Sequence, residues 1–411
     1  TTEIYTLSLH DALPISQMQN VYGQGWSGHF AFEENGSWGP KMDGKIRPWG
    51  AVVDNQQQIK PFSNLEDNIK DFYELGKSYS HSVSVTGGND KQNFRMSFSN
   101  TSEDGIIPDR NDYFERNTFG FSGTLKGDKV SLSASMNYVR RDGKAPSDGR
   151  GGTNSAANLF SELLQVPRDI SLVDHKDYVN NKFNREENYF TVYAYNPYYA
   201  IHQNSNKFIE DRAYGNAALT YQLLPELKAT WRVGSDITNY RRKDWEAVLK
   251  FPSDSWAATG GKKENPGFYS ERFGYYREIN SDLLLQYDKD LTESLNLSAV
   301  VGYNINQRDE RDLYSEINAL ALPGWYNLRN SATPPTSRTQ EEKRRMYGLF
   351  GSVDMAFKSM VYLTLTARND WSSTLPKDNN SFFYPSVSTS IILSELVPAI
   401  KDYGFAKVRA S

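Results

Sequence analysis

The 411-residue sequence lacks cysteine entirely, which excludes disulfides, thiolate metal sites and cysteine nucleophiles. It also lacks an excess of either charge, since 46 Lys and Arg face 50 Asp and Glu, and this balance creates no field that attracts nucleic acid. No unbroken apolar run exceeds four residues, whereas a membrane-spanning helix needs about 20. Aromatic residues, in contrast, make up 13% of the chain. A polar, tyrosine-rich composition of this kind is typical of β proteins in which apolar and polar residues alternate.

Period-2 alternation dominates the sequence from about residue 79 onward. In one segment, Val130, Leu132 and Ala134 alternate with serines. Successive side chains of a strand point to opposite faces, so each such segment predicts a strand with one apolar and one polar face. Ten residues at about 3.3 Å rise and about 40° tilt cover about 25 Å, the height of the lipid-facing band of a membrane barrel. The predicted strands are 79–86, 91–102, 113–126, 129–141, 208–223, 227–242, 271–288, 294–308, 342–357, 360–371 and 382–393.

The connections between these strands alternate in length. Short ones such as 127–128 and 358–359 alternate with long ones such as 142–207 and 309–341. Short turns at one end and long loops at the other are typical of outer-membrane barrels, whereas a Greek-key sandwich has no reason to alternate in this way. Alternation alone leaves both folds open. The position of Leu132, Leu297 and Leu363 distinguishes them, because a sandwich buries these side chains between two sheets and a barrel turns them toward lipid.

Motifs for chemistry are sparse. Residues 23–28 match G-x-G-x-x-G, but no buried strand precedes them and no helix follows, so they predict a turn-rich loop. The histidines show no metal-ligand spacing, and neither H-E-x-x-H nor G-x-S-x-G occurs. Asp109, Asp112 and Glu115 carry the oxygen ligands that calcium takes, although a solvated loop is the simpler interpretation. Because carboxylates are numerous, a glycosidase with two paired carboxylates stays open as an alternative.

Aromatic residues in the predicted loops are the candidate ligand contacts. Flat rings stack on sugar faces or peptide side chains at little cost in entropy. Loop packing, or an aromatic girdle at the membrane interface, would use the same residues without a ligand. One helix is also expected in the longest loop, over 156–166, ended by Pro167 and capped by Asn154 or Ser155. The predicted substrate-contacting residues are Trp245, Trp256, Tyr269, Trp325 and Tyr326.

A series of short motifs resembles the SusC/RagA family of TonB-linked outer-membrane transporters of Bacteroidetes. Each motif alone is weak, but their order along the chain is specific. The motifs are YGQG at 22–25, SWGPKMDG at 37–44, FYELG at 72–76, VTGGNDK at 85–91, GIIP at 105–108, AANL at 156–159, NPY at 196–198, RNDWSSTLP at 368–376, YPSVS at 384–388 and KVRAS at 407–411.

The resemblance implies an all-β fold, namely a partial transmembrane antiparallel up-and-down β-barrel with long extracellular loops and short periplasmic turns. Residues 17–411 are then about half of a 22-stranded TonB-dependent receptor barrel, truncated at both ends and without the plug. A further strand is expected to begin near Phe405. Residues 1–16 resemble a translated sequencing adapter and are expected to be an artefact outside the fold. The open edges would lie near the first strand and near 382–393, so the chain alone is not expected to form a stable pore.

The resemblance further implies a function without catalysis or cofactors, the uptake of oligosaccharides, or as a second choice peptides, across the cell outer membrane. A SusD-like surface lipoprotein caps such a barrel, and TonB pulls on the plug in the missing N-terminal part. Both are therefore expected partners, together with a glycan or peptide ligand and outer-membrane lipid, and no nucleic acid is expected. The alternative is a non-transporting carbohydrate-binding β-sandwich or surface protein.

Overall fold

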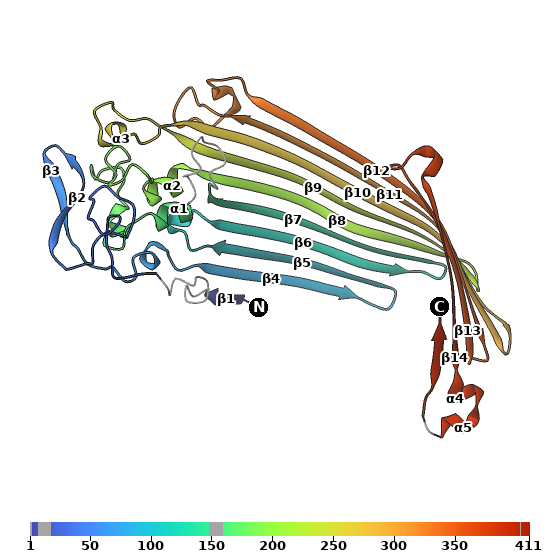
Figure 1. The fold of residues 1–411 in the computed structure, drawn as a ribbon. Helices are drawn as coiled ribbons and strands as arrows, with labels where there is room; N and C mark the ends of the chain where they lie inside the picture. Colours follow the sequence, from blue (N-terminus) through green and yellow to red (C-terminus); the bar gives the residue numbers. More distant parts are fainter. Residues whose placement is uncertain (1, 7–17, 148–158, 403) are drawn as a thin grey trace.

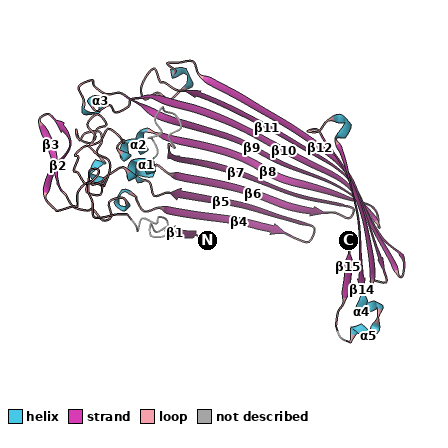
Figure 2. Ribbon diagram, in the orientation of Figure 1, coloured by secondary structure: helices cyan, strands magenta, loops and turns pink. Residues whose placement is uncertain are grey.

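The dominant feature of the computed structural model is one antiparallel sheet (Figures 1 and 2). The structure describes residues 2–6, 18–147, 159–402 and 404–411. Within these residues the sheet has thirteen strands, in which β4 to β15 follow chain order and β1 lies beside β4. A single sheet of sequential neighbours confirms the predicted up-and-down barrel wall and contradicts the two-sheet sandwich. The strands are β1 (Thr2–Thr6), β4 (Lys77–Gly88), β5 (Gln92–Asp104), β6 (Tyr113–Lys126), β7 (Val130–Pro146), β8 (Ser205–Leu224), β9 (Leu227–Leu249), β10 (Asn265–Thr292), β11 (Leu295–Ile317), β12 (Thr336–Phe357), β13 (Val361–Ser372), β14 (Ser381–Ile392) and β15 (Lys407–Ala410).

The remaining elements are short. A separate hairpin pairs β2 (Ile46–Val53) with β3 (Gln56–Pro61). The helices are α1 (Leu159–Leu164), α2 (Pro197–Gln203), α3 (Trp256–Thr259), α4 (Leu393–Leu396) and α5 (Pro398–Lys401), with single 3-10 turns at Lys70–Phe72, Pro108–Arg110, Val173–His175, Leu328–Asn330 and Lys377–Asn379. In the part of the chain that the structure describes, no helix is both long and apolar enough to span a bilayer.

The register of the sheet sorts its side chains onto two faces. Cross-strand partners share a face, so the pairing of Leu132 with Leu219, of Leu219 with Trp231 and of Trp231 with Leu283 defines one apolar row. The row continues through Tyr303 and Leu349. All of these side chains are exposed, and Leu297 and Leu363, which lie on the same face, are not buried either. This face is therefore the lipid-facing side of a barrel wall, as the alternation predicted.

The strands outgrow the predicted segments at the end of the sheet that carries the long loops. β10 has 28 residues and β9 and β11 have 23 each, whereas about 9–11 residues span a bilayer. The extra residues therefore extend the wall beyond the membrane. The opposite end has the predicted tight turns. In one of them Gly88 has a φ of +143°, and a Cβ there would come within 2.2 Å of the carbonyl oxygen of Gln92. Only glycine fits that position.

One connection and both edges differ from the expectation. The connection from β14 to β15, 393–406, lies at the tight-turn end but contains α4 and α5 (Figure 1). The strand expected near Phe405 is present as β15, so the outer strand on that side is β15 and not 381–392. On the other side Thr2–Thr6 pairs with β4, although residues 1–16 were expected to lie outside the fold. Residues 1 and 7–16 lie outside the described residues, so the origin of this segment stays a prediction.

The larger hydrophobic cluster lies in a loop layer, while a smaller one around Tyr269 and Ile317 lies on the sheet. We define the loop layer as residues 18–76, 105–112, 159–204 and 250–264, at the long-loop end (Figure 1). One cluster of buried residues there includes Phe72, Leu163, Leu172, Tyr189 and Ile201. α1 confirms the helix expected over 156–166, while its expected caps Asn154 and Ser155 lie outside the described residues. The loop layer thus folds like a small globular domain.

Candidate functional site

The polar face of the sheet carries a ladder of arginine–carboxylate pairs, which is the first part of the candidate site. These pairs bridge neighbouring strands or lie along one strand, and their N–O distances are those of charge-assisted hydrogen bonds. The pairs are Arg212–Asp236 at 2.5 Å, Arg272–Asp312 at 2.6 Å, Arg242–Asp244 at 2.6 Å, Arg368–Asp370 at 2.7 Å, Arg232–Asp282 at 3.1 Å and Arg308–Glu310.

Strand geometry explains the pairs that lie along one strand. Residues i and i+2 of a strand point to the same face, so Arg242 and Asp244, or Arg368 and Asp370, stand side by side. Gly348 of β12 makes room for the second pair, because a Cβ there would lie 2.5 Å from the guanidinium of Arg368. The sheet therefore presents preordered donors and acceptors whose charges nearly cancel.

Tyrosines alternate with the ion pairs on this face. The guanidinium of Arg212 lies 4.8 Å from the ring centroid of Tyr214, that of Arg308 lies 5.0 Å from Tyr276, and that of Arg338 lies 4.9 Å from Tyr314. Each tyrosine is at least partly exposed. A cavity of about 310 Å³ opens on the same face, and its lining includes Asn137, Tyr214, Asn216, Asp236, Glu278 and Asn280. Flat rings beside hydrogen-bonding groups can bind a polar solute without any bond chemistry.

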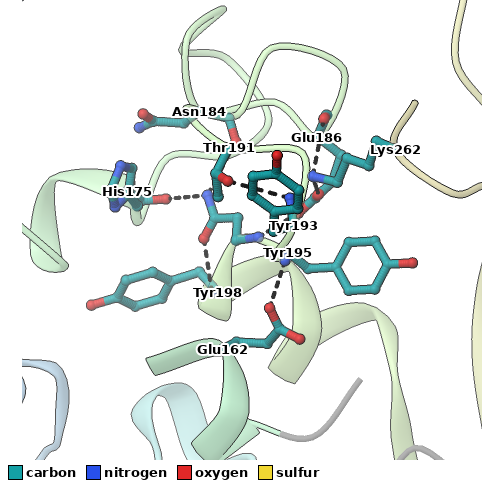
Figure 3. A network of polar contacts seen from close by, with 10 residues as sticks. Glu162, His175, Asn184, Glu186, Thr191, Tyr193, Tyr195, Tyr198 and Lys262 are labelled. Atoms are coloured by element: carbon teal, nitrogen blue, oxygen red, sulfur yellow. Dashed lines mark hydrogen bonds and ion pairs between the residues drawn. The ribbon is translucent and has the colours of Figure 1, made fainter. Parts of the chain in front are cut away.

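The loop layer is the second part of the site, and a buried polar network holds it together (Figure 3). Lys262 donates to the carboxylate of Glu186 at 2.7 Å, and both side chains are only 3% exposed. The amide of Asn196 donates to the carbonyl oxygens of His175 and Asn184, and its oxygen caps α2 by accepting from the N–H of Tyr198. Asparagine at the N-cap followed by Pro197 at the first helical position starts α2 at this residue.

Burial shifts the pKa values in this network. It raises the pKa of the Glu162 carboxyl to about 8, although the N–H of Tyr195, which donates at 2.5 Å, favours the ionised form. It raises the pKa of Glu186 against the opposing effect of Lys262. It lowers the pKa of His175 to about 3, with a smaller contribution from the charge of Lys60. Burial in the loop layer therefore disfavours the charged forms of these groups, which is characteristic of a packed interior.

A second buried pair joins distant parts of the loop layer. Lys60 of β3 forms an ion pair with Asp169, and Asp169 also accepts from the N–H of Gln24 at 2.7 Å. Burial lowers the pKa of Lys60 to about 8, while the charge of Asp169 opposes this shift. These contacts hold residues 18–76 against residues 159–204, so the two segments form one unit.

Three of the five predicted ligand-contacting aromatics come together. The rings of Trp245 and Tyr326 are 5.8 Å apart, and those of Tyr269 and Tyr326 are 6.5 Å apart. Trp245 and Tyr269 are cross-strand partners, and they lie on the same face as Ile237 and the apolar rows. With Ile317 and Leu320 they form a packed cluster at the top of the lipid-facing side. Their contact with substrate stays a prediction.

The other two aromatics lie apart from this cluster. Trp256 begins α3 and packs against Phe32, with ring centroids 6.1 Å apart. Its indole N–H is buried without a hydrogen-bond partner in the described residues. Trp325 lies in the connection between β11 and β12 and is 46% exposed. The structure therefore distributes the five residues over three places.

The carboxylates considered for calcium each have a protein partner. Asp112 accepts from the N–H groups of Ile106 and Ile107 at 2.9 Å each, and burial raises its pKa to about 6. Asp109 contacts His202 at 3.1 Å and Glu115 contacts Arg110 at 3.6 Å. Over the described ranges, no group of three metal-ligating side chains gathers.

Sequence reasoning missed the tyrosines and ion pairs of the polar face. Part of their signal was nevertheless present, because Arg-x-Asp, Arg-x-Glu and Tyr-x-Glu spacings recur within the predicted strands and in the residues that follow them. Examples are Arg308 with Glu310, Tyr276 with Glu278, and Tyr314 with Glu316. Spacing by two residues predicts one shared face, which the alternation argument already contained.

Comparisons with known proteins agree with this geometry. No protein-family model matches the chain. The chain is 22% identical over 339 residues to TonB-dependent receptor P26 of Formosa agariphila, covering 81% of this chain and 32% of the relative. The RagAB peptide importer in its open-open state matches with a TM-score of 0.63 and 16% identity, over 80% of this chain and 35% of that one. Its closed-closed state matches with a TM-score of 0.62 and 16% identity, over 83% and 36%.

The chain thus spans about a third of the length of the proteins it matches. All of these are named as receptors or transporters, and none as an enzyme. The sheet, its two faces and its asymmetric connections are those of an outer-membrane barrel, and the fold is similar to part of the barrel of the SusC/RagA-like TonB-dependent transporters that it matches.

Proposed function

We propose that this chain contributes part of the barrel wall and extracellular loops of an importer that takes up oligosaccharides across the outer membrane. The observation that carries the proposal is the polar face of β8–β11, where tyrosine rings stand beside arginine–carboxylate pairs. Because the pairs nearly cancel in charge, the face suits a neutral solute with many hydroxyl groups. A strongly anionic cargo would favour an excess of cations instead.

Peptide is the second candidate cargo. The solved structures with the same fold are named as a peptide importer. A peptide presents both donors and acceptors along its backbone, which the same ladder of Arg and carboxylate groups can pair. A SusD-like lipoprotein over the loop layer and TonB on the periplasmic side complete the proposed system. In it Trp256 and Trp325 are the proposed loop contacts of the ligand, while Trp245, Tyr269 and Tyr326 form a separate cluster that packs where β9, β10 and the β11–β12 connection meet.

The test compares a tyrosine on each face of the wall in the whole outer-membrane protein that contains this chain. Tyr276→Ala removes a ring from the polar face, and Tyr303→Ala removes one from the lipid-facing row. We expect Tyr276→Ala to weaken oligosaccharide binding about tenfold, equivalent to about 1.4 kcal/mol, and Tyr303→Ala to leave it unchanged. The measurement is uptake and equilibrium binding of labelled oligosaccharides and labelled peptides in parallel.

Each outcome assigns the cargo. Loss of oligosaccharide binding in Tyr276→Ala alone supports the first candidate, and loss of peptide binding alone supports the second. If neither solute class binds the parent protein, or if both variants behave alike, the polar face is not the solute path and the proposal fails.

A further inference from the structure

A large cavity lies on the outward side of the wall, away from the polar face. It has a volume of about 830 Å³ and opens beside β10, β11, β12 and the 373–380 connection. Arg277, Asp309 and Lys343 form one cross-strand row in its wall, and Gln307 and Arg345 form the next. These residues share a face with the apolar rows, since Gln307 follows Ile305 by two residues.

The height of the cavity places it just above the lipid-facing band. On β11 the outward side chains from Leu295 to Ile305 are apolar, and this stretch covers about 25 Å at about 40° tilt. Ile305 pairs with Tyr347, which pairs with Trp371, so aromatic rings mark the upper limit of the band. Both rings also line the cavity. Within the next two outward positions, β10, β11 and β12 carry the charged residues Arg277, Asp309 and Arg345, at the level where lipid headgroups lie.

The cavity carries an excess of positive charge. Its lining contains six basic residues and three acidic ones, namely Arg277, Arg311, Lys343, Arg344, Arg345 and Lys377 against Asp309, Glu310 and Glu341. Arg277 pairs with Asp309 and Arg311 with Glu341. Among the described residues, no carboxylate lies within 4.0 Å of the charged groups of Lys343, Arg345 or Lys377. The outward cavity thus has basic side chains without acidic partners, whereas the arginines on the polar face are matched by carboxylates.

The connection after β13 holds one of these cations in place. The N–H of Arg345 donates to the hydroxyl of Ser373 at 2.8 Å, and the N–H of Ser373 donates to the carbonyl of Arg345 at 2.9 Å. The guanidinium of Arg345 donates to the side-chain oxygen of Gln307 at 3.1 Å. These bonds fix Arg345 at the cavity wall, and the remaining donors of its guanidinium are free to take an anion.

We propose that this cavity binds the phosphate-bearing headgroup of a lipid in the outer leaflet. Arginine and lysine pair well with phosphate oxygens, and clusters of them at a membrane surface attract anionic headgroups. The apolar rows directly below accept the acyl chains, and Trp371 and Tyr347 sit between the two. A soluble anion on its way through the lumen would meet the other face of the sheet. The bound lipid fixes the depth of β10–β12 in the membrane.

The test uses the whole protein that contains this chain, reconstituted in nanodiscs whose lipid is phosphatidylcholine with diphosphorylated lipid A or with its dephosphorylated form. Retained lipid is counted by native mass spectrometry after mild detergent extraction. The variant Lys343→Gln/Arg345→Gln removes the unpaired charges, Lys343→Arg/Arg345→Lys keeps them, and Arg338→Gln removes a charge from the opposite face of the same strand. Heat-modifiable migration on gels confirms that each variant is folded.

We expect the charge-removing variant to retain about thirtyfold less diphosphorylated lipid A, and the other two variants to match the parent. Equal retention in all variants overturns the proposal, as does equal retention of the phosphorylated and dephosphorylated forms. A third arm titrates inorganic phosphate alone. If it binds the parent as tightly as the lipid does and displaces it fully, the cavity is a site for a free anion and the lipid assignment fails.

Discussion

The sheet and the loop layer use the same residue types in opposite ways. In the sheet, large apolar side chains such as Leu132, Leu283 and Leu349 are exposed, and hydrogen-bonded polar groups cover the other face. In the loop layer, Phe72 and Leu163 are buried, and charged groups such as Lys262 are buried only with a partner. The difference follows from the surrounding medium, because the apolar face of the sheet is made for lipid whereas the loops fold in water. One chain thus follows two sets of packing rules.

The largest expected effect comes from breaking a buried ion pair in the loop layer. Lys262→Met leaves the carboxylate of Glu186 buried without its partner, and we expect it to cost about 3–5 kcal/mol of loop-layer stability. Hydrogen exchange of the loop-layer amides in the whole protein measures this opening free energy. The neighbouring Lys263 is exposed, so Lys263→Met is the matched control. Equal exchange in the two variants would mean that the network does not support the layer.

The next effect tests which face of the sheet meets lipid. Leu285 pairs with Val301, near the middle of the apolar stretch from Leu295 to Ile305, while Gln286 is on the polar face of the same strand. Leu285→Arg is expected to destabilise the barrel by about 2–4 kcal/mol near the bilayer midplane, and Gln286→Arg by much less. Denaturant unfolding of the whole protein in lipid vesicles gives both values. A larger cost for Gln286→Arg would reverse the assignment of the faces.

A smaller effect distinguishes the loop layer by its pH dependence. The pKa of Glu162 is raised to about 8 in the folded state, so the folded protein binds more protons than the unfolded chain between about pH 4.5 and 8. Stability therefore falls as the pH rises through this window. His175, whose pKa is lowered to about 3, acts in the opposite direction between about pH 3 and 6.5. The difference between parent and Glu162→Gln isolates the first group.

Hydrogen exchange of the loop layer at pH 5, 6.5 and 8, corrected for intrinsic rates, measures this difference. We expect the variant to lose less stability with rising pH than the parent does. Asp174→Asn, at an exposed carboxylate of the same layer, serves as the control and should follow the parent. If Glu162→Gln also follows the parent, the carboxyl is already ionised in the folded state.

Much of the sheet could be predicted from the sequence, because the alternation of apolar and polar residues that identifies a strand lies within that strand's own residues. The ends of the strands were missed where the sheet continues past the alternation of apolar and polar residues, as at 243–249 and 309–317. β10 begins six residues before its predicted start, across Pro266 and Gly267, since pairing with β9 continues beyond the alternation. The β2–β3 hairpin was missed because Pro48 and Gly50 disturb its first strand, and its pairing comes from the loop layer around it.

The site was harder to predict for a different reason. Loop aromatics were selected by residue type, but their surroundings depend on contacts distant in the sequence, such as Tyr326 with Trp245. The face of Trp245 could have been predicted, because Trp245 lies eight residues after Ile237, and residues an even number apart in a strand share a face. The buried pairs Lys60–Asp169 and Lys262–Glu186 join residues 109 and 76 apart. No local pattern marks such pairs, so only the folded structure identifies them.

The smallest expected effect completes the comparison, since it concerns the same ion-pair chemistry in the sheet. The side chains of Arg212 and Asp236 are 44% and 27% exposed, against 3% for each partner in the loop layer. Water and salt screen such a pair, so Arg212→Gln is expected to cost only about 0.2–1 kcal/mol. A double-mutant cycle with Asp236→Asn, at low and at high salt, measures the coupling. A coupling as large as that of Lys262 with Glu186 would mean that the polar face is dry, and a solute path along it would then be closed.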